Sequence, residues 1–413
     1  MMKKIKTLLL GVCSLLSVTA INAQQNNDVV VGAANIDAYL PALSGKKVAV
    51  FANQTSLVNQ THLVDTLQKL GVNIVKIFSP EHGFRGTADA GAYIKNSTDS
   101  ATGLPIISLY GTNRIPTAAQ LSDIEVVIFD MQDVGVRFYT YISSLEEMLE
   151  QTLINQKTLI VLDRPNPNGF YIDGPVLEKG FKSFVGKQAI PIVYGMTIGE
   201  YAKMLVGEKW LNGAANTAYG KNEGLLKVVP LINYNRKETY DLPVKPSPNL
   251  PNLQSILLYP SLCFFEGTNV SLGRGTNLPF QIYGAPSLPN NLWSFTPKSV
   301  AGATNPPLKG LKCYGYDLSK VEIDITNKQW QRIQLGFLLN AYEKYSNKNS
   351  FFLNAGKSNP KPTDYFFNKL AGNRSLMVQV MNNESEASIR KSWEEGLETF
   401  KVVRSKYLLY TDF

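Results

Sequence analysis

The chain has 413 residues, of which 44% are hydrophobic and 18% charged, with a formal net charge of +8. This composition excludes an intrinsically disordered chain and a small disulfide-held scaffold, and the length predicts two or three domains of roughly 150 residues each. Removing the three lysines of the predicted leader from the 41 basic residues leaves 38 against 33 acidic ones, a net charge of +5. No run of Lys or Arg stands out, so nothing in the charge pattern indicates nucleic-acid binding.

The first 23 residues have the pattern of a bacterial secretory signal. Three lysines precede an apolar run over residues 8–16, and Ile21-Asn22-Ala23 resembles a cleavage site. A lipoprotein signal at Cys13 is disfavoured because Val12 before it is not a small residue. We expect cleavage after Ala23 and a secreted, periplasmic protein with no membrane attachment after cleavage.

Short apolar runs alternate with amphipathic stretches from residue 46 to about residue 163. The runs are apolar at almost every position, as in strands that are buried on both faces of a parallel sheet. The alternation predicts an α/β fold with a doubly wound, mostly parallel sheet. The expected strands are 47–51, 73–78, 105–109, 125–130 and 158–163, and the expected helices between them include 62–70 and 143–155.

The rest of the chain predicts a second domain. A strand at 190–194 and a helix at 197–210 are followed by sequence rich in Pro and Gly over about 243–307, which we interpret as long loops. We therefore expect a signal peptide over 1–23, a Rossmann-like domain over 24–310 and a smaller C-terminal α/β domain over 311–413. The elements expected in the C-terminal domain are strands 311–318 and 320–325 and helices 328–345, 363–371 and 384–406.

Polar residues follow four of the predicted strands, where a doubly wound sheet binds its ligands. These segments are 53–55, 79–86, 130–141 and 163–167. Each segment by itself could consist of turn and cap residues. Because the carboxyl ends of parallel strands meet at one edge, the four segments together favour a ligand site.

Common cofactor and nucleophile motifs are absent from the sequence. Gly273-Arg274-Gly275 lacks the third glycine of a dinucleotide loop, and the chain has no phosphate-binding Gly-Lys-Ser/Thr loop and no Gly-x-Ser-x-Gly elbow. With only His62 and His82 a His-rich zinc site is excluded, whereas a carboxylate-held Mg²⁺ or Ca²⁺ stays open. We expect no cofactor. Cys263 and Cys313 could pair or lie apart.

Carboxylates are the remaining candidates for chemistry. Hydrolysis of a glycoside needs one carboxylic acid to protonate the leaving oxygen and a second carboxylate as base or nucleophile. Glu266 lies in a loop rich in Gly, Thr and Asn, whereas Asp130 and Asp163 are in positions that more often brace loops. The full set of candidates is Glu81, Glu266, Asp130, Asp133 and Asp163.

Four of these segments resemble the NamZ-type exo-β-N-acetylmuramidases, glycoside hydrolase family 171, formerly a domain of unknown function. The segments are 79–86, 129–141, 163–167 and 266–271, and the resemblance extends in the same order over about 40–413. It implies a Rossmann-like domain, a smaller C-terminal domain and an active site in the cleft between them. It also implies release of N-acetylmuramic acid from the non-reducing ends of peptidoglycan fragments.

The resemblance also assigns roles to residues. Glu81 occupies the position of the family's catalytic Glu in a Pro-Glu-His-Gly motif, and Glu266 matches the acid of a Glu-Gly-Thr-Asn motif. The lactyl carboxylate of N-acetylmuramic acid calls for an arginine, and Arg85 is favoured because it follows Glu81 by four residues, with Arg137 second. The other expected substrate-binding residues are Asn53, His82, Asp130, Gln132, Asp133, Tyr139, Asp163, Arg164, Asn269 and Arg274, with Phe84 and Tyr141 as further rings for stacking.

Two other functions fit the same sequence. A non-catalytic muropeptide-binding protein would use the same cleft without needing a pair of carboxylates. A periplasmic amidase or esterase would need a nucleophile, and no Ser or Cys lies in a recognisable setting. The sequence does not indicate an oligomeric state.

Overall fold

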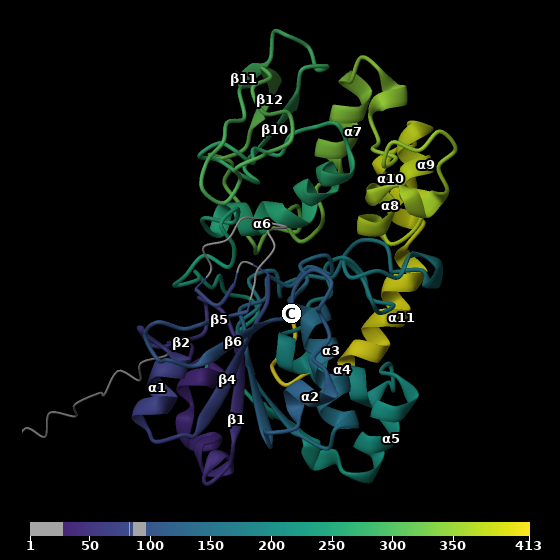
Figure 1. The fold of residues 1–413 in the computed structure, drawn as a ribbon. Helices are drawn as coiled ribbons and strands as arrows, with labels where there is room; N and C mark the ends of the chain where they lie inside the picture. The colour runs from purple at the N-terminus through teal and green to yellow at the C-terminus, as the bar shows by residue number, and fades with distance from the viewer. Residues whose placement is uncertain (1–27, 82, 86–95) are drawn as a thin grey trace, which may run out of the picture.

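The computed structural model describes residues 28–81, 83–85 and 96–413. The predicted signal peptide and His82 lie outside these residues. Figure 1 shows two lobes: one built around a large sheet, and a second lobe above it that contains a small sheet and several helices. Within the described ranges, every helix is too short or too polar to span a lipid bilayer.

The first lobe contains a seven-stranded sheet with the order β5-β6-β4-β1-β7-β8-β9. All neighbours pair in parallel except β5 (Ser97–Thr98), which lies antiparallel to β6 at one edge. Numbered by appearance, the parallel strands run 3-2-1-4-5-6, the Rossmann order, which confirms the predicted doubly wound sheet. They are β1 (Val48–Ala52), β4 (Ile74–Ser79), β6 (Pro105–Ser108), β7 (Val126–Asp130), β8 (Thr158–Leu162) and β9 (Leu226–Val229).

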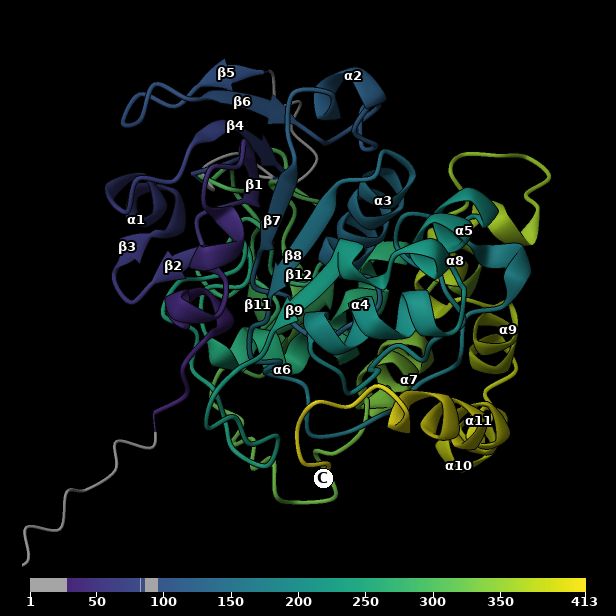
Figure 2. The ribbon, with the colours of Figure 1, turned by 90° about the horizontal axis from the view of Figure 1, so that it is seen from below.

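Helices cover both faces of this sheet, as Figure 2 shows with α1 on one side and α3, α4 and α5 on the other. Val48 and Val50 of β1 pack toward α1 (Leu63–Lys69), and Ala49 and Phe51, which alternate with them along the strand, pack toward the opposite face. Both faces are therefore apolar, as the sequence predicted. The remaining elements of the lobe are η1 (Gly32–Ala34), η2 (Ile36–Ala38), η3 (Leu40–Leu43), β2 (Leu57–Val58), β3 (Thr61–His62), α2 (Ala118–Leu121), α3 (Tyr141–Ile154), η4 (Lys179–Phe181), α4 (Ile198–Gly207), α5 (Gly213–Lys221) and η5 (Glu223–Leu225).

The second lobe begins earlier than predicted. Its antiparallel sheet has the order β10-β12-β11, so a boundary at residue 311 would separate β12 from both of its partners. The Pro- and Gly-rich region expected as loops also contains α6 and η6. The elements of this lobe are α6 (Leu253–Leu262), η6 (Cys263–Gly267), β10 (Ile282–Ala285), β11 (Trp293–Phe295), β12 (Cys313–Asp317), α7 (Leu335–Lys344), η7 (Lys348–Ser350), η8 (Pro362–Asp364), α8 (Phe366–Ala371), α9 (Ser375–Met381) and α10 (Glu386–Lys391).

The end of the chain returns to the first lobe. After α11 (Glu394–Ser405), the Tyr410 hydroxyl donates to Asp163 Oδ2 at 2.6 Å, and the Leu409 amide donates to Glu200 Oε1 at 2.8 Å. The last residues of the predicted C-terminal domain over 311–413 therefore contact the first lobe.

Four further predicted elements differ from the structure. Residues 190–194 make isolated bridges rather than a strand, since Val193 pairs singly with Val136 and Asp173. Residues 320–325 form no strand, and the helix expected over 328–345 begins only at Leu335. The helix expected over 384–406 is broken between α10 and α11.

Gly267 allows α8 to lie against η6. A Cβ atom at this position would lie 2.4 Å from the backbone nitrogen of Phe367, closer than real contacts allow. We expect Gly267→Ala to destabilise the protein by about 1–3 kcal/mol, because α8 would have to move. The measurement is the midpoint of urea unfolding. Gly336→Ala in α7 is the matched control: its Cβ meets nothing within 4 Å, so alanine there should be neutral or stabilising by up to about 1 kcal/mol. Equal effects of the two substitutions would contradict the packing argument.

Candidate active site

A cleft of about 460 Å³ lies between the carboxyl edge of the large sheet and the second lobe. From the first lobe, Glu81 follows β4, Tyr110 follows β6, and Tyr139 and Tyr141 follow β7. The second lobe contributes Tyr259, Glu266, Arg274, Phe280, Phe366 and Lys369. The structure thus brings Glu81 and Glu266, 185 positions apart in the sequence, to the same cleft.

Glu81 is half-buried and accepts a hydrogen bond at Oε1 from the Tyr110 hydroxyl, at 2.8 Å. Tyr110 follows β6, the neighbour of β4 in the sheet. The hydrogen bond therefore joins the loops that follow two adjacent strands and orients the carboxylate. A neutral phenol donor orients one carboxylate oxygen without contributing a charge.

Glu266 forms an ion pair with Arg274. Arg274 Nη2 donates to Glu266 Oε1 at 2.6 Å, and the two side chains are 20% and 24% exposed. The guanidinium also lies over the ring of Phe280, 5.0 Å from its centroid. Glu266 is therefore oriented by a fixed cation.

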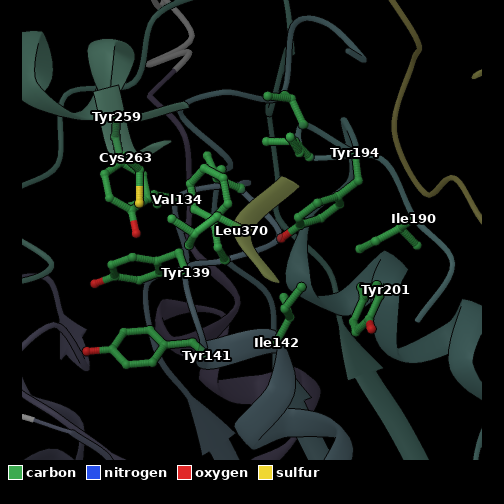
Figure 3. Close-up of a cluster of buried hydrophobic side chains, with 14 of the residues drawn as sticks. Val134, Tyr139, Tyr141, Ile142, Ile190, Tyr194, Tyr201, Tyr259, Cys263 and Leu370 are labelled. Atoms are coloured by element: carbon green, nitrogen blue, oxygen red, sulfur yellow. The ribbon is translucent and has the colours of Figure 1, made fainter. Parts of the chain in front are cut away.

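Tyrosine rings form one wall of the cleft that contains Glu81 and Glu266. This aromatic wall consists of Tyr139, Tyr141 and Tyr259. Tyr139 and Tyr141 lie edge to face, 4.9 Å apart, and Figure 3 shows their hydroxyls pointing in the same direction below Tyr259 of α6. The Tyr139 hydroxyl donates to the Pro246 carbonyl at 2.9 Å. Burial raises the pKa of both Tyr139 and Tyr141 above the ordinary value of a phenol, so both stay neutral hydroxyls.

Asn53, predicted to bind substrate, instead supports this aromatic wall. Its Nδ2 donates to the Tyr141 hydroxyl at 2.7 Å, and its Oδ1 accepts from the Thr55 amide at 2.9 Å. The side chain is fully buried.

Asp130 and Arg164, both predicted to bind substrate, bind each other. Arg164 donates to the two carboxylate oxygens of Asp130 at 2.6 and 2.8 Å and to the Leu57 carbonyl at 3.0 Å. Both side chains are buried, and neither lines the cleft. The pair joins the loops that follow β7 and β8.

Three further predicted substrate-binding residues are also buried and stabilise loops through hydrogen bonds: Gln132, Asp133 and Asp163. Gln132 donates to the Asp133 and Pro165 carbonyls at 2.7 and 2.6 Å. Burial raises the pKa of Asp133 to about 7, although donors from Tyr194 and the Gly135 amide oppose the shift. Burial also raises the pKa of Asp163 to about 6, at the N-terminus of α4.

Arg85, the favoured ligand for the lactyl carboxylate, does not line the cleft. Its guanidinium donates to Asp99 at 2.8–3.1 Å and lies 4.6 Å from the centroid of the Phe84 ring. Phe84 is itself buried against His62 rather than available for stacking on a sugar. An arginine already paired with a carboxylate inside the protein has no free charge to offer a ligand.

Arg137, the second choice, is fully buried. Its guanidinium donates to four backbone carbonyls, and burial lowers its pKa to about 9. The acceptors, at 2.7–2.9 Å, are the carbonyls of Pro175, Ile190, Leu370 and Ala371. The side chain therefore connects the first lobe to α8 instead of contacting a ligand.

Of the residues predicted to bind the substrate or to stack on it, Tyr139, Tyr141 and Arg274 line the cleft. Asn269 lies in an adjoining hollow of about 720 Å³, which shares Glu266, Arg274 and Phe366 with the cleft. Its Nδ2 donates to the Ser350 carbonyl at 2.5 Å. His82 falls outside the described residues.

Sequence reasoning missed several polar residues that line the cleft, among them Tyr110, Arg114, Ser183 and Lys369. Tyr110 and Arg114 could have been found from the sequence, because both lie in the segment that follows the predicted strand 105–109, and this segment also reaches the carboxyl edge of the sheet. Lys369 lies on α8, and no local pattern distinguishes it from a solvent-facing helix residue.

The described part of the chain contains no group of three or more His, Cys, Asp or Glu side chains suited to a metal ion. Cys263 and Cys313 are both buried and free, so the structure does not pair them. Cys263 belongs to the apolar cluster beside the cleft, with Tyr259 and Val134 (Figure 3).

We expect Arg137→Met to destabilise the protein by at least about 3 kcal/mol, because four carbonyls lose a charged donor. Arg85→Met removes a side chain that is 41% exposed, although its partner Asp99 is buried, and should cost about 1–2 kcal/mol, less than Arg137→Met. Urea unfolding of both variants is the measurement. A stable Arg137→Met protein with a selectively raised KM would restore Arg137 as a substrate ligand.

A Rossmann-type sheet, closed by a second lobe over a cleft with two carboxylates and several aromatic rings, defines a two-lobed α/β protein whose site is of the kind that cleaves sugars. Family models described as exo-β-N-acetylmuramidase NamZ, N-terminal and C-terminal, match residues 48–254 and 257–410. The chain belongs to the NamZ exo-β-N-acetylmuramidase family.

Individual relatives agree with this membership. The peptidoglycan β-N-acetylmuramidase NamZ of Bacillus subtilis is 34% identical over 400 residues, covering 91% of this chain and 90% of that protein. Two crystal structures of DUF1343 family proteins from Bacteroides fragilis share the fold. One has a TM-score of 0.82 and 41% identity over 94% of this chain and all of that one; the other has a TM-score of 0.73 and 28% identity over 93% and 99%.

Proposed function

We propose that this protein is an exo-β-N-acetylmuramidase that releases N-acetylmuramic acid from the non-reducing ends of peptidoglycan fragments during cell-wall turnover. The observation that carries this proposal is the presence of Glu81 and Glu266 in one cleft, formed by the two lobes of a NamZ-family chain. Glycoside hydrolysis needs two carboxyl groups on either side of the scissile bond.

The surroundings of the two carboxyl groups suit different roles. Glu81 is held by a neutral hydroxyl, which is compatible with a group that gives and takes a proton as the glycosidic oxygen leaves. Glu266 is held by a guanidinium, which favours a fixed anion that stabilises positive charge developing on the sugar ring or orients water. The neutral tyrosines of the wall provide faces and edges for the sugar.

We expect Glu81→Gln to lower kcat on a chromogenic muraminide by about 10²–10⁴-fold, because the amide preserves the shape of the side chain but cannot transfer the proton. Glu266→Gln should also lower kcat, since the anion is lost. The measurements are kcat and KM for both variants, with N-acetylmuramic acid binding as a check that the cleft is intact.

Glu322→Gln, an exposed carboxylate outside the cleft, is the matched control and should turn over normally. Near-normal turnover by Glu81→Gln would overturn its role. A Glu266→Gln variant that changes only KM would make Glu266 a binding residue. If the unaltered protein binds N-acetylmuramic acid tightly and hydrolyses no muraminide, the protein is a muropeptide-binding protein instead.

We also infer that residues 1–23 direct export to the periplasm. The support is the order of basic, apolar and small residues in this segment. N-terminal sequencing of protein recovered from the periplasmic fraction should find Gln24 as the first residue. Protein retained in the cytoplasm with residues 1–23 intact would contradict this inference.

A further inference from the structure

Two cationic side chains line the cleft without a carboxylate partner in the described part of the chain: Arg114, after β6, and Lys369, on α8. The guanidinium groups of the arginines expected from sequence to bind the substrate, by contrast, already have acceptors within the protein. Arg85 pairs with Asp99, Arg164 with Asp130, Arg274 with Glu266, and Arg137 with four backbone carbonyls.

The guanidinium of Arg114 is held in place by Phe184. Its Cζ lies 4.1 Å from the centroid of the Phe184 ring, a cation–π contact that fixes the plane of the group. Arg114 Nε is buried and has no hydrogen-bond partner among the described residues. The Ser183 hydroxyl, adjacent to Phe184 in the chain and also at the cleft, is buried and unpaired in the same way.

A partly buried cation that lacks hydrogen-bond partners lowers the stability of the protein. A ligand that accepts those hydrogen bonds removes this cost. A carboxylate is the ligand that matches a planar guanidinium fork best. An ammonium group and a hydroxyl lining the same cleft add further donors. These donors along the cleft therefore fit an anionic group on the substrate.

The position of Arg114 in the chain links it to Glu81, the proposed proton-transfer residue. Arg114 follows Tyr110 by four residues in the loop after β6, and the Tyr110 hydroxyl binds Glu81. One short loop thus holds both a partner of the proposed proton-transfer group and the unpaired guanidinium. A substituent on the sugar that undergoes cleavage can reach Arg114 from the same cleft.

We propose that Arg114, assisted by Lys369 and the Ser183 hydroxyl, forms a carboxylate-binding site for the 3-O-lactyl group of the terminal sugar, and that this site selects muramic acid over glucosamine. The inference rests on the proposed function. It assigns the role to Arg114 instead of Arg85, whose charge is already paired with Asp99. The site takes the free lactyl acid, because an amide at this position would present no charge to the guanidinium.

The test compares three glycosides: the muraminide, the same muraminide with its lactyl group converted to an amide, and the matching N-acetylglucosaminide. We expect Arg114→Ala to lower kcat/KM on the muraminide by about tenfold to a hundredfold, the loss typical of a charged hydrogen bond, with little change on the two uncharged substrates. Arg114→Lys should recover part of the loss. Arg332→Ala, an exposed arginine outside the cleft, is the matched control and should change none of the three values.

Binding of the free sugars separates this inference from the proposed function. Titration calorimetry should show that N-acetylmuramic acid binds more tightly than N-acetylglucosamine, and that Arg114→Ala removes the difference even when no turnover is measured. If the unaltered protein cleaves the muraminide but Arg114→Ala keeps full preference for it, the carboxylate site is overturned and the muramidase activity stands. A preference for the lactyl amide over the acid would likewise overturn it.

Discussion

The cleft depends on the burial of one guanidinium. Arg137 emerges from the loop after β7, deep between the lobes, where its charge can be accommodated only if carbonyl oxygens surround it. Two of those oxygens belong to the first lobe and two to the end of α8. Because α8 also carries Phe366 and Lys369 into the cleft, the same hydrogen bonds set how close the second lobe's wall lies to the carboxyl edge of the sheet.

The core of the fold could be predicted because its signal is local. A run such as 126–130 is apolar at successive positions only when both faces of a strand are buried, and five such runs lie in β1, β4, β6, β7 and β8. The second lobe gave no such signal. Its strands are short, Gly284 and Gly315 interrupt two of them, and β10 pairs with β12 about thirty residues further along the chain.

The structure places both predicted carboxylates in the cleft, whereas most of the predicted substrate-binding residues do not line it. Polar residues at a carboxyl edge have two uses: some reach the ligand, and others hold the loops that carry it. Asp130 and Arg164 occur in motifs as distinctive as that of Glu81, yet they satisfy each other. Sequence alone does not separate these uses, because the difference lies in which partner each side chain meets across strands that are far apart in the chain.

The last residues of the chain complete the interior of a lobe whose strands are all present by residue 229. Asp163 at the end of β8 receives one of its donors from Tyr410, 247 positions later, and Glu200 receives one from Leu409. A ribosome releases the amino end first, so the first lobe emerges with each of these carboxylates lacking one donor until the final segment is made. The interior of the first lobe is therefore complete only when the whole polypeptide has been synthesised.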